Sequence, residues 1–190
     1  MKHYLIAGEM SGDIHGANLM KGILKEDSDA EFCYFGGDRM EMVSGVKPSL
    51  HISKMSFMGF IEVIFNLKTI LKNMSFCKKD IIKFNPDVII FIDFPGFNLR
   101  IAEFTFEKNI KAFYYISPQI WAWKEGRIKK IKKLIDQMYV ILPFEVDFYK
   151  KHNVDAHFFG NPVLDEVLSK QKVVASTLLK NQQKQVAILP

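Results

Sequence analysis

Apolar and polar positions follow two periods along the chain, one typical of strands and one typical of helices. Runs rich in β-branched and aromatic residues predict six strands, at 3–8, 31–36, 87–93, 111–116, 137–142 and 156–160. Helical patterns lie between or beside them, at 13–25, 58–84, 98–108, 124–135 and 144–151. The alternation predicts right-handed βαβ units and therefore a doubly wound, mostly parallel α/β sheet.

The loops that follow the predicted strands are rich in Gly, Pro, acids and aromatic residues. They read GEMSGD, GGDRM, DFPGFN, SPQIWAW, LPFE and GNP. In open parallel sheets, ligands bind beyond the carboxyl ends of the strands. We therefore predict one composite site built from several of these loops.

The first loop, GEMSGDIHG, has neither the glycine spacing of a dinucleotide fingerprint nor the lysine of a Walker loop. We expect Ser11 or Asp13 to cap a helix that begins near Ile14, with the cap favoured for Asp13. Glu9 ends the strand and is expected to project into the cleft. The glycines at positions 12 and 16, Gly12 and Gly16, would let a bulky ligand approach the backbone closely.

Asp93 directly follows the most apolar strand, whose two faces both read as buried. Partial burial there would raise the pKa of its carboxyl and favour a general base. The residues alone fit an Asx turn equally well. Pro95 and Gly96 predict a tight turn, and Asn98 is expected to cap the next helix.

An aromatic segment with two tryptophans precedes the basic segment 124–133. The six bases and one acid of 124–133 account for the net charge of +5, so the chain carries a basic patch rather than a basic character. Such a helix is either a solvated face or a contact for an anionic membrane surface. Nucleic acid is not expected as a partner, because the rest of the chain contributes no basic excess.

The segment 55–67 is apolar on nearly every side of a predicted helix. One face can pack on the sheet. The other is expected to contact a second domain, lipid chains or the membrane interface, or to be buried within the fold.

Composition narrows the class of protein. Of the 190 residues, 48% are hydrophobic and 25% charged, which is typical of a globular protein. We expect no signal peptide and no membrane span, since no apolar run reaches about 18 residues. Cys33 and Cys77 lack the spacing of a zinc site or a disulfide framework, which favours a reducing cytoplasm.

The pattern also predicts how the chain is divided into domains. We predict one domain at 1–168. We expect residues 169–190 to form a linker and the first strand of a second domain that is otherwise absent.

Six motifs occur in the order found in lipid-A-disaccharide synthases: GEMSGD, MGFIEV, DFPGFN, YYISPQIWAW, LPFE and GNP. The resemblance runs from about Tyr4 to Asp165, and the combination is far more specific than any single motif. It implies the Rossmann-like N-terminal domain of a GT-B glycosyltransferase, which would hold the acceptor lipid. It also implies an inverting mechanism with no metal and no other cofactor.

The resemblance implies a role in lipid A biosynthesis. The family transfers 2,3-diacylglucosamine from UDP-2,3-diacylglucosamine to 2,3-diacylglucosamine 1-phosphate (lipid X), forming lipid A disaccharide 1-phosphate and UDP. Its members work at the cytoplasmic face of the inner membrane as peripheral proteins, and a homodimer is compatible with the sequence. The expected membrane contacts are the apolar helix 55–67 and four lysines, Lys129, Lys130, Lys132 and Lys133.

The matching motifs also suggest roles for individual residues. Asp93 or Glu9 would take the proton of the attacking sugar hydroxyl, and the sequence does not choose between them. Many family members have an acid where this chain has Gly96, and a His where it has Asn161. The expected substrate-binding residues are Ser11, Gly12, Asp13, Met58, Gly59, Glu62, Asn98, Ser117, Gln119, Trp121 and Arg127, the last for a phosphate or membrane contact.

Two other functions remain as alternatives. One is a different GT-B sugar-nucleotide enzyme, such as a UDP-sugar epimerase. The apolar segment 55–67 argues against it, because an enzyme with soluble substrates needs no lipid-facing surface. The other is a non-catalytic half-domain that binds lipid or membrane.

Overall fold

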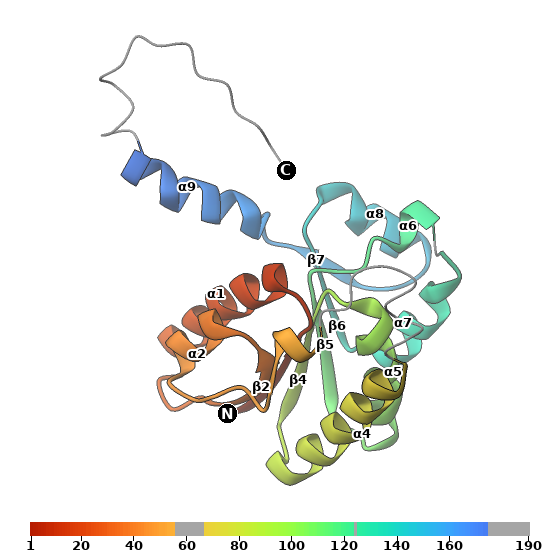
Figure 1. The fold of residues 1–190 in the computed structure, drawn as a ribbon. Helices are drawn as coiled ribbons and strands as arrows, with labels where there is room; N and C mark the ends of the chain where they lie inside the picture. The colour runs from red at the N-terminus through yellow and green to blue at the C-terminus, as the bar shows by residue number, and fades with distance from the viewer. Residues whose placement is uncertain (56–66, 124, 175–190) are drawn as a thin grey trace. The chain divides into compact units, whose positions relative to one another are not determined.

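A computed structural model of the chain describes residues 1–55, 67–123 and 125–174. The chain divides into two compact units, Met1–Phe159 and Gly160–Pro190. The first unit contains the sheet and the described helices up to α8 (Figure 1). The described part of the second unit contains helix α9, Pro162–Val174.

The first unit is built on a sheet of seven parallel strands in the order β3-β2-β1-β4-β5-β6-β7. The six predicted strands are confirmed, and the two-residue β3 is an addition. The order reverses between β1 and β4, which makes their boundary a topological switch point. The strands are β1 Lys2–Ala7, β2 Glu31–Gly36, β3 Leu50–His51, β4 Val88–Ile92, β5 Lys111–Tyr115, β6 Gln137–Val140 and β7 Ala156–Phe158.

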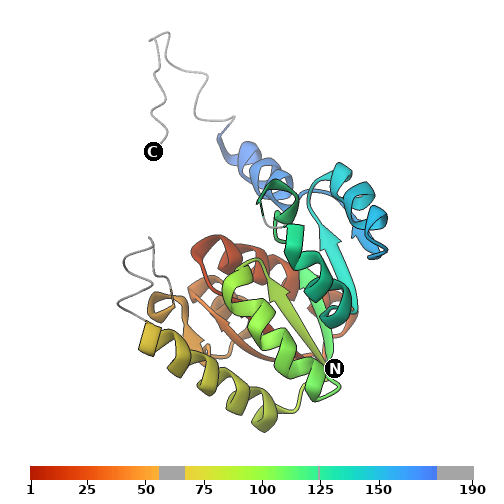
Figure 2. The same cartoon turned by 90° about the vertical axis from the view of Figure 1, so that its right-hand side faces the viewer.

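Helices cover both faces of the sheet, as the doubly wound prediction requires. Helices α1 and α2 pack on one face, and α4, α5, α7 and α8 contribute buried residues to the other (Figures 1 and 2). The helices of this unit are α1 Met10–Glu26, α2 Asp38–Ser44, α4 Leu67–Phe84, α5 Pro95–Glu107, α6 Ile120–Trp123, α7 Ile128–Leu134 and α8 Pro143–Lys151, with 3-10 turns η1 Ile52–Lys54 and η2 Glu125–Arg127.

The core follows from the alternation of side chains along each strand. In β1, Tyr4 and Ile6 enter the cluster that packs on α4 and α5, while Leu5 and Ala7 enter the cluster that packs on α1 and α2. Strand β4 is buried along its whole length on both faces, which confirms the prediction of a central strand.

Strand register brings the strand-end loops to one edge. Ala7 pairs with Ile92, and Ile92 pairs with Tyr115, so β1, β4 and β5 end side by side. Tyr115 in turn pairs with Tyr139 in β6. The residues that follow these strands therefore leave the sheet as neighbours.

Two predicted helix caps are wrong. Helix α1 begins at Met10, with Glu9 at its N-cap, so neither Ser11 nor Asp13 caps it. The amide of Asp13 already bonds back to the carbonyl of Glu9, as an interior helix residue does. Helix α5 likewise begins at Pro95, because proline fits the first helical position, and Asn98 lies inside the helix rather than at its cap.

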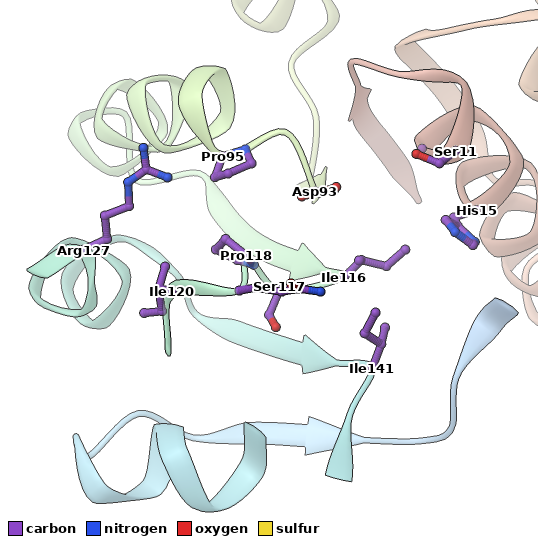
Figure 3. A pocket seen from close by; sticks show the side chains of 12 residues that line it. Ser11, His15, Asp93, Pro95, Ile116, Ser117, Pro118, Ile120, Arg127 and Ile141 are labelled. Atoms are coloured by element: carbon purple, nitrogen blue, oxygen red, sulfur yellow. The ribbon is translucent and has the colours of Figure 1, made fainter. Parts of the chain in front are cut away.

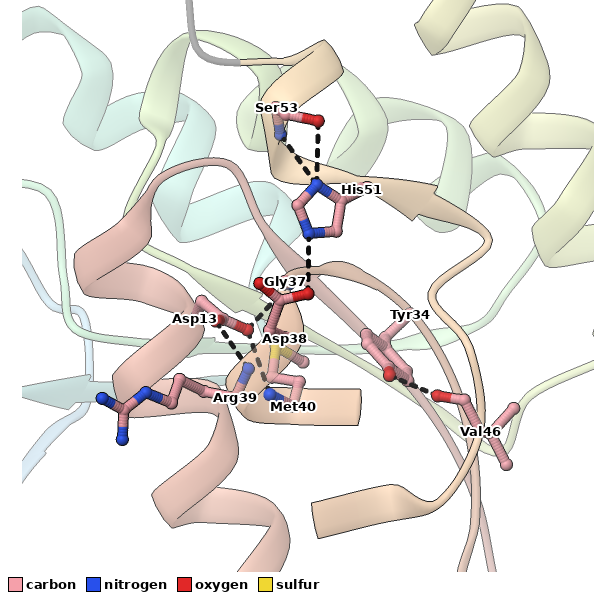
Figure 4. A network of polar contacts seen from close by, with 9 residues as sticks. All are labelled: Asp13, Tyr34, Gly37, Asp38, Arg39, Met40, Val46, His51 and Ser53. Atoms are coloured by element: carbon pink, nitrogen blue, oxygen red, sulfur yellow. Dashed lines mark hydrogen bonds and ion pairs between the residues drawn. The ribbon is translucent and has the colours of Figure 1, made fainter. Parts of the chain in front are cut away.

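Asp13 caps a different helix, α2. Its side chain is only 3% exposed, and its carboxylate accepts hydrogen bonds from the backbone N–H groups of Gly37 (2.7 Å), Arg39 (3.0 Å) and Met40 (3.1 Å) (Figure 4). These amides open α2, where backbone donors lack helical partners. Asp13 therefore joins α1 to α2 across 24 or more residues of sequence.

The glycine at position 16 also serves packing rather than ligand approach. A Cβ at Gly16 would lie 2.6 Å from Sδ of Met40 and 3.1 Å from Cδ1 of Ile92. The absence of a side chain there lets α1 approach α2 and β4 closely.

Some predicted features lie outside the described residues. The segment 56–66 is among them, so the predicted apolar helix at 55–67 and three of its expected substrate contacts, Met58, Gly59 and Glu62, are not described. Within the described ranges, no helix combines the length and the apolar character needed to cross a membrane.

Replacing Asp13 with Ala should lower the free energy of unfolding by about 2 kcal/mol or more, because three backbone amides, two of them buried, lose a charged acceptor. Chemical denaturation monitored by circular dichroism measures the loss. Asp155→Ala, which removes an exposed carboxylate of the same unit, is the control and should change stability by less than about 0.5 kcal/mol. Equal losses in the two variants would contradict the cap.

Candidate active site

A cavity of about 410 Å³ lies where β1, β4, β5 and β6 end (Figure 3). The first turns of α1, the turn after β4, the segment after β5 and the first residue after β6 contribute to its walls, at the strand ends where ligands are expected. Its lining residues are Ser11, Gly12, His15, Asp93, Pro95, Ile116, Ser117, Pro118, Gln119, Ile120, Arg127 and Ile141.

Asp93 is the acid that lines this cavity. It directly follows β4 and is half-buried. Burial raises the pKa of its carboxyl above the usual value, and the negative charge of nearby Glu9 raises it further; a hydrogen bond with the amide of Phe94 acts in the opposite direction. The expected effect of desolvation on Asp93 is thus confirmed.

Glu9 itself is exposed at the N-cap of α1 and is not among the cavity-lining residues. Its negative charge acts on the cavity from outside, by raising the pKa of Asp93. The two candidate bases therefore occupy different environments, one inside the cavity and one beside it.

The backbone around the cavity is strained. Asp93, Phe94 and Ile116 have φ values of 44°, 47° and 64°, in the left-handed region that non-glycine residues rarely adopt. For a β-branched residue such as Ile116 this conformation is particularly unfavourable. Strain of this kind costs about 1–3 kcal/mol per residue and is concentrated at functional sites.

The other left-handed residues outside glycine have an ordinary explanation. They are three asparagines, each just after a helix: Asn85, Asn109 and Asn153. Asparagine tolerates this conformation at helix ends. Aspartate shares this tolerance, but Phe94 and Ile116 do not, and Ile116 lines the cavity together with Asp93.

Asn98 and Tyr114 hold the strained turn in place. The Nδ2 group of Asn98 and the hydroxyl of Tyr114 both donate to the backbone carbonyl of Asp93, at 2.7 and 2.6 Å. Both side chains are fully buried. Asn98 was expected to bind substrate, but its side chain does not line the cavity. It instead donates a hydrogen bond to the backbone carbonyl of Asp93.

Gly8 makes room for the aromatic residue of the same turn. A Cβ at position 8 would lie 2.3 Å from Cδ1 of Phe94, far inside any normal contact. The ring of Phe94 also stacks on Phe97, with centroids 5.6 Å apart. The end of β1 and the end of β4 are thereby packed directly against each other.

The cavity has opposite walls of different character. Figure 3 shows Ser11 and His15 of α1 on one side and Arg127 on the other, with Asp93 between them. Arg127 is half-buried in η2. The site thus combines a partly desolvated carboxylate, a cation and several hydroxyl or amide groups.

Six of the residues proposed from sequence line the cavity together: Asp93, Ser11, Gly12, Ser117, Gln119 and Arg127. Four others do not line it: Glu9 and Asn98, described above, and Asp13 and Trp121. Asp13 faces α2, as described above. Trp121 donates its Nε1–H to Oε1 of Glu145 (3.2 Å) and packs edge-to-face on Phe144, with centroids 5.0 Å apart.

Sequence reasoning missed His15 and several apolar lining residues. His15 lies four residues after Ser11 on α1, so the two share a helix face, and that spacing was an available signal. The apolar lining positions gave no such signal, because their composition is that of a core. They are Pro95, Ile116, Pro118, Ile120 and Ile141.

Comparison with solved structures finds enzymes of similar fold. The UDP-GlcNAc 2-epimerase from Neisseria meningitidis, bound to UDP-GlcNAc, matches 96% of this chain and 52% of its own, with a TM-score of 0.67 and 14% identity. The enzyme from Methanocaldococcus jannaschii, in complex with UDP-GlcNAc and UDP, gives a TM-score of 0.68 at 14% identity, covering 96% of this chain and 51% of its own. At such identity the likeness shows the fold alone, a Rossmann-like α/β domain.

Sequence comparison is more specific. Curated lipid-A-disaccharide synthases from Geobacter metallireducens and Trichlorobacter lovleyi are 39% and 40% identical over 189 residues, which is 98% of this chain and 49% of each relative. The enzyme from Coxiella burnetii is 38% identical over the same length, 50% of its own. The chain thus spans about half the length of the curated relatives it matches.

A family model described as lipid-A-disaccharide synthetase matches residues 3–190. The resemblance carried by the six sequence motifs is therefore confirmed along almost the whole chain. The chain belongs to the lipid-A-disaccharide synthetase family.

Proposed function

We propose that this chain supplies the acceptor-binding half of a lipid-A-disaccharide synthase. The full-length protein would transfer 2,3-diacylglucosamine from UDP-2,3-diacylglucosamine to lipid X, releasing UDP. The observation that carries the proposal is the cavity itself, in which a member of this family presents one partly desolvated carboxylate and one cation at the switch point of the sheet.

Asp93 is the proposed general base. The acceptor hydroxyl would transfer its proton to the Asp93 carboxylate as its oxygen forms the new bond to the anomeric carbon. The bond from that carbon to the UDP oxygen breaks at the same time, and the electron pair leaves with UDP. A raised pKa suits this role, since a stronger base takes the proton more readily.

Glu9 is proposed as the residue that tunes this base. Asp93 lines the cavity, but Glu9 does not. The charge of the exposed Glu9 raises the pKa of Asp93. Arg127 is proposed to bind the acceptor phosphate, since a guanidinium can form paired hydrogen bonds with phosphate oxygens. Ser11, Ser117 and Gln119 provide side-chain groups suited to sugar hydroxyls.

Peripheral association with the cytoplasmic face of the inner membrane is also proposed, through the lysines of α7. All four are exposed. Lys130 pairs with Glu103 at 2.6 Å, and Lys133 lies 5.2 Å from the ring centroid of Phe106. Lys129 and Lys132 take part in neither of these two contacts. They are therefore the proposed contacts for anionic headgroups, and replacing them leaves both contacts intact.

Asp93→Asn should lower turnover of the full-length protein by at least about 100-fold, the scale of losing a general base. Release of UDP from the two acylated substrates measures it. Asp155→Asn serves as the control and should leave turnover unchanged, because Asp155 is an exposed residue outside the cavity. Near-normal turnover of the Asp93 variant would exclude Asp93 as the base.

Glu9→Gln should lower the pKa of Asp93, because a negative charge that opposes its ionisation is removed. NMR titration of the side-chain carboxyl carbon follows this pKa. Since the base acts in its ionised form, the acid limb of the pH–rate profile should move to lower pH in the same variant. A limb that disappears, with Asp93 titrating as before, would instead make Glu9 the base.

Replacing Lys129 and Lys132 together with Gln should weaken binding to vesicles that contain phosphatidylglycerol by about tenfold or more, on the basis of roughly 1 kcal/mol per surface lysine. Co-sedimentation at fixed ionic strength measures the affinity. The matched control replaces Lys21 and Lys25 of α1, on the other face of the sheet. If both pairs reduce binding equally, the effect is one of net charge and α7 is an ordinary solvated face.

A further inference from the structure

Glu145 of α8 is a carboxylate with no exposed surface, and it lies outside the set of cavity-lining residues. Its two oxygens hold different parts of the chain. Oε2 accepts from the backbone N–H groups of Ile141 (3.2 Å) and Leu142 (3.0 Å). Oε1 accepts from the hydroxyl of Ser117 and the indole N–H of Trp121, both at 3.2 Å.

The contacts of Oε2 are local. Glu145 is the third residue of α8, and an acid there commonly bonds back to the N-cap amide, here that of Leu142. This half of the interaction stabilises the start of a helix and implies nothing about the cavity.

The contacts of Oε1 are not local. They reach back 24 and 28 residues to the segment 117–121, whose residues 117–120 line one wall of the cavity. Ser117 itself lines that wall. Helix capping does not require these two bonds, so they are a separate function of the same carboxylate.

The same wall has a second attachment to α8. The hydroxyl of Tyr149 donates to the carbonyl of Pro118 at 3.2 Å, and Tyr149 is fully buried. Ile116 directly precedes this wall, and its φ of 64° is strained. A strained residue keeps its conformation only when its surroundings hold it, and the two bonds from α8 to the next residues do so.

Burying a carboxylate is costly unless its oxygens are satisfied. Four donors satisfy Glu145, and among the described residues none of the ion pairs involves it. The charge thus contributes strength to the four bonds, since bonds to an ionised acceptor are about twice as strong as neutral ones.

We propose that Glu145 is a positioning residue of the active site. Through Oε1 it sets where the wall 117–121 stands relative to Asp93, and so how the acceptor sugar is oriented for attack. This role rests on the proposed function. Glu145 acts through Ser117 and Trp121 and does not itself touch the substrate.

The test separates the two oxygens. Trp121→Phe removes the N–H that bonds to Oε1 while keeping an aromatic ring against Phe144, and it leaves the helix cap intact. Glu145→Gln keeps one carbonyl oxygen for the cap, but its amide group cannot accept the indole N–H. Glu103→Gln, an exposed change of the same type on α5, is the matched control.

Amide hydrogen exchange measures the position of the wall without reference to activity. In Trp121→Phe, exchange should accelerate at residues 119–121 and remain unchanged at 141–142 and in β4. Glu145→Gln should also accelerate exchange at 119–121. Unchanged exchange at 119–121 in both variants would overturn the proposal, because Glu145 would then be a helix cap only.

Kinetics of the full-length protein give the second measure. Each variant should lower kcat/KM for lipid X by about tenfold, the effect of one lost charged hydrogen bond, and the double variant should be little worse than either single one. A fall in melting temperature with normal kcat/KM would overturn the positioning role. If the wild-type protein does not convert the acylated sugars at all, the proposed function fails, while hydrogen exchange still decides whether Glu145 holds the wall.

Discussion

Buried carboxylates that accept backbone hydrogen bonds hold the carboxyl edge of this sheet together. Parallel register brings four strands to an end at one edge, and the segments that follow must find hydrogen-bond partners for their own amides. Asp13 satisfies the amides that open α2, and Glu145 satisfies those that precede α8. Asp13 lies within α1 and Glu145 within α8, and the cavity is lined by residues of α1 and of the segments that follow β5 and β6.

Asp93 contrasts with these two acids. Its backbone carbonyl is held firmly by Asn98 and Tyr114, yet its carboxyl has a raised pKa because burial and a neighbouring charge are only partly offset by hydrogen bonding. Full satisfaction would lower that pKa and make the group a poorer base. A fixed backbone and a carboxylate with few stabilising hydrogen bonds suit the general base proposed for Asp93. The strained backbone of this turn lowers the folding stability.

Strand positions and the central β4 were predictable because side-chain burial imposes a period that the sequence displays. Helices α2 and α6 were not, since seven and four residues are too few to show a period. The cap of Asp13 was assigned to the wrong helix because its partners lie 24 to 27 residues away, beyond any local rule. The strand-end rule located the loops of the site, and the family motifs then suggested the six residues that line the cavity. The left-handed conformation of Ile116 had no signal, because isoleucine does not favour it.

The contact of Gly8 with Phe94 constrains how this edge can change during evolution. Any side chain at position 8 would collide with the ring of Phe94, so the side chains at positions 8 and 94 compete for the same space. A larger residue at position 8 becomes tolerable only after position 94 has become smaller, and a smaller residue at 94 leaves a void beside Phe97. Each single step is therefore unfavourable, and the pair is expected to persist or to change together.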